Sequence, residues 1–272
     1  MFAQQPAPRP RKLPMELKTV QTPHVPVRYY EGGKGQPLVF LHGAGGVDLD
    51  MGFLDALAER FHVYAPLMPG FGDSEECAEL RDMLDFTLHT WDVLSALGLK
   101  DPILVGFSMG GMIASEMAAV APSDVSRLAL IAPAGLWLDA HPIPDIFSLL
   151  PYQLPSYLFH DAEAGAKIMS AGGDMSDPKF LQDFLVQAAR QLGAAGKIMF
   201  PIPDRGLSSR LYRIKAKTIL IWGQSDKLIP PVYAPAFQRG IAGSELVLIP
   251  EAGHVVAFEK PQDVIRAITR LA

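Results

Sequence analysis

Cysteine is almost absent from this sequence, which contains a single residue of that type, Cys77. One cysteine cannot form an intramolecular disulfide, and it supplies too few ligands for a cysteine-based zinc site. We therefore expect a protein of a reducing compartment, the cytoplasm, with no metal bound through cysteine.

An excess of positive charge is also missing, because 24 Lys and Arg residues face 29 Asp and Glu residues, for a net charge of -5. Nucleic acids and anionic membranes attract proteins with a broad positive field, so neither is expected as the main partner. The longest apolar runs, such as 129–134, are much shorter than the roughly 18 residues of a membrane span. Residues 1–14 are rich in proline and lack the apolar segment of a secretory signal, which predicts a flexible arm.

What the chain does have is ample apolar surface, with 49% hydrophobic and 19% charged residues. Short β-rich runs alternate with helical patterns, which is typical of a mostly parallel sheet flanked by helices. We expect strands at 17–22, 27–31, 37–41, 61–65, 102–105, 126–131, 218–222 and 245–249, and helices at 49–60, 79–98, 109–121 and 261–271. This alternation of strands and helices is absent between 134 and 212, where prolines separate short helical pieces. We therefore expect a helical cap inserted into a core of residues 15–133 and 213–272.

The most informative motif is G-x-S-x-G, formed by Gly106, Ser108 and Gly110 directly after a predicted strand and directly before a predicted helix. A sharp turn at this place lifts one side chain off the edge of the sheet, and small residues on both sides permit that turn. Ser108 would then stand at the helix N-terminus, where its hydroxyl can attack a carbonyl while the Met109 N–H faces the developing negative charge.

In this context the chain resembles the α/β-hydrolase fold family from about residue 17 to the C-terminus, which implies a mostly parallel eight-stranded sheet. The segment His42-Gly-Ala44 is similar to the oxyanion loop of the family, and the resemblance implies that Ala44 supplies a second oxyanion N–H. The segment 69–74 resembles the P-G-x-G-x-S loop, and 223–230 and 253–254 resemble the G-x-x-D-x-x-x-P and G-H endings of the family.

A serine nucleophile needs an imidazole base and a carboxylate that holds the tautomer of that base. The chain order Ser, Asp, His is the one expected for this fold, and Ser108, Asp226 and His254 satisfy it. His254 is the histidine that follows the last predicted strand, whereas the other six lie in hairpin, strand, helix, oxyanion-loop or cap positions. The rivals of Asp226 as the acid are Asp124, Asp139 and Glu251, none of which fits the motif.

These residues predict a serine hydrolase that cleaves a small, apolar or aromatic carboxylic ester through an acyl-enzyme, without a cofactor or a metal. Two alternatives stay open: a carbon–carbon bond hydrolase acting on ring-cleavage products, and a ligand-binding or lyase member of the fold. The first typically shows G-N-S-x-G-G and a cap arginine, whereas here Phe107 replaces the asparagine and Arg190 matches only approximately. Haloalkane dehalogenases of this fold carry an aspartate nucleophile, and Ser108 argues against that activity. We expect a small-molecule substrate, and we expect the protein to be a monomer or a homodimer. The predicted substrate pocket is lined by Phe107, Trp137, Phe147, Trp222 and Val255.

Overall fold

The computed structural model describes residues 15–169, 177–202 and 204–272. The arm predicted for residues 1–14 lies outside these ranges. One eight-stranded sheet forms the centre, in the order β1-β2-β4-β3-β5-β6-β7-β8. Its strands are β1 (Glu16–Val20), β2 (Val27–Gly32), β3 (Pro37–Leu41), β4 (His62–Pro66), β5 (Ile103–Phe107), β6 (Arg127–Ile131), β7 (Lys217–Gly223) and β8 (Glu245–Ile249).

The sheet is mostly parallel because only β2 runs against the other strands. Strand β1 pairs antiparallel with β2, and β2 pairs antiparallel with β4. From β4 through β3 and β5 to β8 every pairing is parallel. The carboxyl ends of β3, β5, β7 and β8 therefore meet at one edge, where loops can place side chains next to one another.

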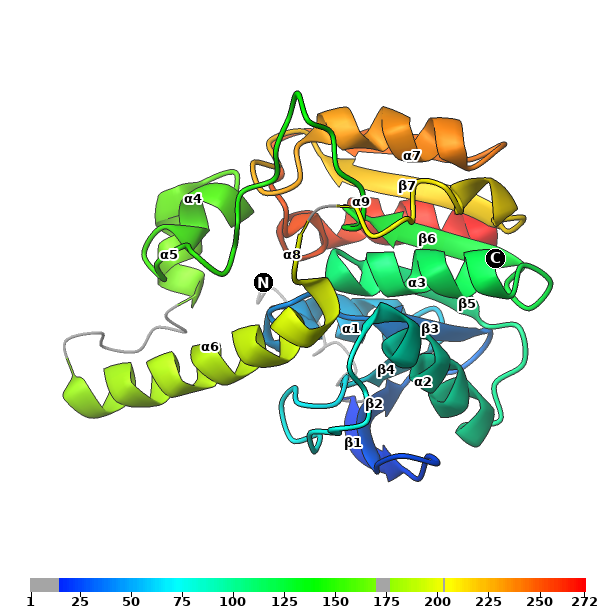
Figure 1. The fold of residues 1–272 in the computed structure, drawn as a ribbon, viewed down its shortest axis with the longest axis horizontal. Helices are drawn as coiled ribbons and strands as arrows, with labels where there is room; N and C mark the ends of the chain where they lie inside the picture. The colour runs from blue at the N-terminus through cyan, green and yellow to red at the C-terminus, as the bar shows by residue number, and fades with distance from the viewer. Residues whose placement is uncertain (1–14, 170–176, 203) are drawn as a thin grey trace, which may run out of the picture.

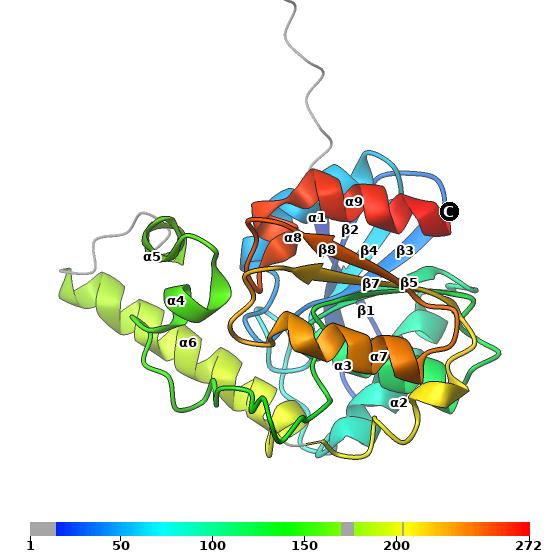
Figure 2. The same cartoon turned by 90° about the horizontal axis from the view of Figure 1, so that it is seen from above.

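Helices cover both faces of the sheet, which buries the central strands on both sides (Figures 1 and 2). One face carries α1 (Met51–Ala58), α8 (Val256–Glu259) and α9 (Pro261–Ile268), and the other carries α2 (Met83–Ala96), α3 (Met109–Val120) and α7 (Ala234–Gly240). Short 3-10 turns lie at Asp48–Asp50, Leu211–Arg213, Pro231–Tyr233 and Thr269–Leu271. The apolar core correspondingly divides into two clusters, one against each face.

We call residues 134–212, which the chain places between β6 and β7, the insert. It contains α4 (Leu154–Leu158), α5 (Ala162–Met169) and α6 (Pro178–Met199), which stand to one side of the layered core (Figures 1 and 2). Helix α6 begins at Pro178, where the Asp177 side chain accepts a hydrogen bond from the Lys179 N–H, and it ends before Pro201.

The α/β-hydrolase fold class is confirmed, and each predicted strand is present within a few residues of its predicted bounds. The insert differs from the expectation of short helical pieces, because α6 is one helix of 22 residues. No proline interrupts the sequence between Pro178 and Pro201, so nothing breaks the helix once its cap is in place. Helices α7 and α8 were not predicted, because they are too short to show a clear periodicity. No helix in the described residues is long and apolar enough to cross a membrane.

Candidate active site

Ser108 lies on the sharp turn between β5 and α3, with φ 51° and ψ -114°. The turn is held by backbone hydrogen bonds from the Ser108 N–H to the Ile131 carbonyl (2.9 Å) and from the Ala134 N–H to the Ser108 carbonyl (3.0 Å). Neighbouring glycines are required by close approach, since a Cβ on Gly106 would lie 2.4 Å from the Gly110 carbonyl oxygen. A Cβ on Gly110 would lie 2.1 Å from the Leu41 carbonyl oxygen. The motif residues thus allow a strained turn that fixes the Ser108 hydroxyl at the edge of the sheet.

The structure brings the three predicted catalytic residues into one hydrogen-bonded row. The Ser108 hydroxyl lies 3.0 Å from His254 Nε2, and His254 Nδ1 lies 2.8 Å from Asp226 Oδ2. All three side chains are buried. Because the carboxylate can only accept, the proton of the imidazole belongs on Nδ1, which leaves Nε2 free to accept the proton of the serine. This arrangement can activate the hydroxyl as a nucleophile.

Asp226 is held on the loop after β7 by its own backbone surroundings. Its Oδ1 accepts hydrogen bonds from the N–H groups of Leu228 (2.9 Å) and Ile229 (2.8 Å), which leaves Oδ2 for the imidazole. The same loop is tied to the core by Trp222, whose indole N–H donates to the Ile229 carbonyl at 2.8 Å. Trp222 was expected to line the pocket, whereas the structure buries its side chain completely beside Phe237, so it supports the Asp226 loop from the core side.

His42 fixes the predicted oxyanion loop after β3, a role that was not assigned to it from the sequence. His42 Nε2 accepts a hydrogen bond from the Met68 N–H (3.0 Å), so Nδ1 carries the proton and donates to the Gly43 carbonyl at 2.7 Å. Burial lowers the pKa of His42 to about 4. The imidazole is therefore neutral at pH 7, and its two bonds join the oxyanion loop to the loop that follows β4. Its position in the His-Gly motif was the only sequence signal for this role.

The Gly43 carbonyl accepts a second hydrogen bond from the Gly46 N–H at 3.1 Å. A trans peptide places its N–H opposite its carbonyl, so these two bonds also set the direction of the Ala44 N–H. The loop lies against the nucleophile, because a Cβ on Gly43 would be 3.4 Å from the Ser108 Cβ. Met109 opens α3 directly after Ser108, and the first N–H groups of a helix have no acceptor within that helix. The two predicted oxyanion donors thus belong to segments next to Ser108, the loop after β3 and the start of α3.

The other predicted pocket residues divide between the site and the insert. Phe107 lies at the site, with its ring centroid 5.1 Å from that of His254. Val255 follows the base, and its N–H donates to the Leu158 carbonyl at 3.1 Å. Trp137 and Phe147 are half-buried within the insert, where Trp137 donates to Asp139 and the Phe147 ring lies 6.0 Å from that of Phe200. The structure brings Phe107 and Val255 to the triad and records no contact of Trp137 or Phe147 with it in the described residues.

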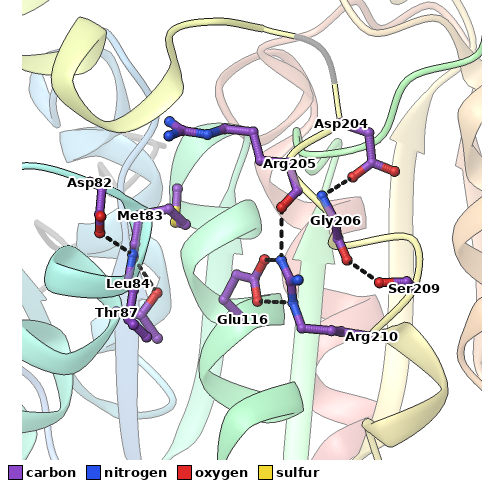
Figure 3. A network of polar contacts seen from close by, with 10 residues as sticks. All are labelled: Asp82, Met83, Leu84, Thr87, Glu116, Asp204, Arg205, Gly206, Ser209 and Arg210. Carbon is purple, nitrogen blue, oxygen red and sulfur yellow. Dashed lines mark hydrogen bonds and ion pairs between the residues drawn. The ribbon is translucent and has the colours of Figure 1, made fainter.

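The insert is anchored to the core near the site. The His160 N–H donates to Glu259 (2.9 Å), and His160 Nδ1 lies 2.8 Å from the hydroxyl of Ser225, the neighbour of Asp226. At the other end of the insert, Arg210 forms a two-pronged ion pair with Glu116 of α3, at 2.6 and 2.9 Å (Figure 3). The insert is thus tied both to the loop that carries the acid and to the helix that begins at the nucleophile.

Cys77 is buried away from these groups, and its thiol donates to Glu79 at 3.1 Å. Burial and the neighbouring carboxylate raise the pKa of this thiol. It is therefore a poor nucleophile at neutral pH.

Known proteins of several hydrolase classes are similar to this chain. A 2-hydroxy-6-oxo-6-phenylhexa-2,4-dienoate hydrolase of Comamonas testosteroni is 28% identical over 268 residues, which cover 88% of each chain. Lipase 1 of Psychrobacter immobilis is 28% identical over 245 residues, which cover 85% of this chain and 75% of the lipase. Relatives with different substrates thus have similar identity to this chain, so identity alone does not select a substrate.

Among solved structures, the carboxylesterase CesB of Bacillus subtilis matches with a TM-score of 0.71 at 22% identity, covering 95% of this chain and 92% of the esterase. At this sequence identity the structural match shows a shared fold and nothing about the substrate. The sequence model of the alpha/beta hydrolase family matches residues 38–267, a range that contains the elbow, the oxyanion loop and the acid and base loops. The chain belongs to the α/β-hydrolase family.

Proposed function

We propose that this protein is a serine hydrolase that cleaves small, apolar or aromatic carboxylic esters. The observation that carries the proposal is the buried row from Ser108 through His254 to Asp226, with 3.0 and 2.8 Å between the bonded atoms. A serine held on a strained turn beside a base, which is in turn oriented by a carboxylate, is the arrangement that activates an oxygen nucleophile. Esterases and lipases among the relatives support the same class.

In the proposed reaction the Ser108 oxygen attacks the ester carbonyl while its proton passes to His254 Nε2. Asp226 stabilises the imidazolium that forms and keeps the ring in place. The carbonyl oxygen becomes negative, and the N–H groups of Ala44 and Met109 donate to it. His254 then gives the proton to the leaving alcohol, which leaves an acyl-enzyme on Ser108. A water molecule activated by His254 releases the acid by the same steps.

The test is hydrolysis of p-nitrophenyl acetate and butyrate by the wild-type protein and by Ser108→Ala. We expect a burst of nitrophenol with the wild type and a rate about 10⁴-fold to 10⁶-fold lower with the variant, since the nucleophile is lost. An unchanged melting temperature of Ser108→Ala shows that the fold is intact. Turnover that survives the substitution, or ligand binding without turnover in the wild type, contradicts the proposal, and the second result favours the ligand-binding alternative.

The carbon–carbon bond hydrolase remains a second candidate on two observations. The first is the name of the Comamonas testosteroni relative, which describes a hydrolase of a dienoate. The second is Arg190, which lines a cavity of about 240 Å³ beside the oxyanion loop, together with Asp48 and Asp73. Phe107 stands where that subfamily has an asparagine, which disfavours the carbon–carbon bond hydrolase. A panel of esters and ring-cleavage dienoates decides between the two: a kcat/KM for a dienoate more than about 100-fold above that for the esters selects the second candidate.

A further inference from the structure

Helix α6 of the insert lies beside the loop that carries the proposed oxyanion donor. The three atoms nearest to a Cβ position on Gly46 belong to Gln191 and Phe71, and Gln191 Nε2 lies 3.3 Å away. Ala194, one turn further along α6, lies 3.0 Å from the corresponding position on Gly70. Lys197 follows on the same face and pairs with Glu76 at 3.1 Å. The inner end of α6 thus lies along both the oxyanion loop and the loop after β4.

Gly46 is the residue through which this contact reaches the chemistry. Its N–H holds the Gly43 carbonyl from one side, while His42 Nδ1 holds it from the other. As long as that carbonyl is held, the Ala44 N–H points the opposite way. If Gly46 moved, the Gly43–Ala44 peptide would lose one of its two restraints, and a rotation would turn a carbonyl oxygen towards a developing negative charge.

The support that α6 gives to this loop is narrow. Between α6 and the two loops lies the cavity of about 240 Å³, lined on the α6 side by Gln187, Arg190 and Gln191. Gln191 and Gly46 line this cavity together, whereas Ala194, Ala195 and Ile198 further along the helix are buried. A single truncation at Gln191 removes much of the support without opening the core.

We propose that α6 keeps the Gly43–Ala44 peptide in the orientation that aims the Ala44 N–H at the reacting carbonyl, with Gln191 as the positioning residue. The proposal rests on the serine hydrolase function proposed above. It assigns the insert a part in the rate of the chemical step, in addition to any contact with substrate. Gln191 acts through Gly46 and does not itself touch the reacting atoms.

The experiment compares Gln191→Ala with Gln187→Ala, a matched truncation one turn earlier on the wall of the same cavity, and with Gln191→Met, which keeps the length of the side chain. The substrate is p-nitrophenyl acetate, which has the shorter acyl group of the two test esters. We expect Gln191→Ala to lower kcat by about 10-fold to 100-fold with KM changed less than about twofold, a partial loss of one oxyanion donor. Gln187→Ala stays within about twofold, and Gln191→Met recovers most of the rate.

Two further measurements separate this role from a purely structural one and from failure of the proposed function. Affinity for a trifluoromethyl ketone, which forms an oxyanion on Ser108, should fall in Gln191→Ala by the same factor as kcat/KM. Hydrogen exchange of the backbone over 42–47 should quicken in Gln191→Ala with an unchanged melting temperature, and this readout needs no turnover. If the wild type hydrolyses no ester, the proposed function fails while exchange still tests the contact. Unchanged exchange over 42–47, or a rise in KM alone, overturns the inference.

Discussion

Helices α3 and α6 differ sharply in how firmly the protein holds them. Every residue of α3 from Met109 to Ala119 is buried, between the sheet and α2. In α6, which is almost twice as long, the buried residues are Ala194, Ala195 and Ile198, all near its C-terminal end. Leu185 and Val186 in the outer part are about half exposed. The helix that begins at the nucleophile is buried along its length, whereas the insert helix is buried only near one end.

This difference indicates where each part can affect the reaction. Catalytic groups must keep their geometry to within a fraction of an ångström, which requires neighbours that are themselves fixed. The insert meets that requirement only where it is anchored, at the inner end of α6, at His160 and at Arg210. Substitutions in the core and at these anchors should therefore have large effects, and matched substitutions elsewhere in the insert should have small ones.

The largest expected effect is on the acid of the triad. Asp226→Asn puts an amide where the carboxylate accepts from His254 Nδ1, so the ring loses the tautomer that leaves Nε2 free. We expect kcat for p-nitrophenyl butyrate to fall about 10⁴-fold with little change in KM. Asp139→Asn, an exposed aspartate of the insert that the sequence offered as a rival, is the control and should keep nearly full activity. The opposite pattern would show that the insert supplies the acid.

The same contrast explains how much the sequence could predict. The central strands are apolar on both faces and separated by Gly and Pro, so their number and order were predictable, as was the triad order along the chain. Trp222 shows the limit: its apolar ring near the acid suggested a pocket wall, but strand periodicity cannot tell which buried face a residue occupies when both faces are apolar. Gln191 could not be predicted either, because its partner Gly46 is 145 positions away and no local pattern records the contact.

The next effect in size concerns the anchor of the insert on α3. Arg210→Met removes both hydrogen bonds to Glu116 and leaves that carboxylate buried without its partner. Because Arg210 is itself partly exposed, we expect the free energy of unfolding to fall by about 2–3 kcal/mol, somewhat less than for a fully buried pair. Urea denaturation followed by circular dichroism measures it.

The matched control for this anchor is Lys179→Met, which breaks the exposed pair of Lys179 with Asp183 at the outer end of α6. An exposed pair one helical turn apart contributes little, so the change should be within about 0.5 kcal/mol. Equal losses in the two variants would mean that the insert is held as firmly at its outer end as at its anchor, and the comparison of α3 with α6 would then be wrong.

The smallest effect is a pH dependence of stability that originates in the core. His89 of α2 is buried with no hydrogen-bond partner for either ring nitrogen among the described residues, and its ring lies 6.0 Å from that of His24. Burial, and to a lesser degree His24, lower the pKa of His89 to about 4. In the unfolded chain a histidine titrates near 6.5. Between about pH 6.5 and 4 the unfolded state therefore binds more protons than the folded state, and stability falls as the pH falls through this window.

Replacing His89 with leucine should remove this contribution, because leucine fills the apolar site and carries no proton. We expect the free energy of unfolding of His89→Leu to change less between pH 7 and pH 4.5 than that of the wild type, by about 1–3 kcal/mol. Some acid sensitivity will persist, since burial lowers the pKa of His42 in the same way. His141→Gln, at an exposed histidine of the insert, is the matched exchange. A wild-type slope in His89→Leu would show that His89 does not contribute to the acid sensitivity, and a slope lost in His141→Gln would place an acid-sensitive group in the insert.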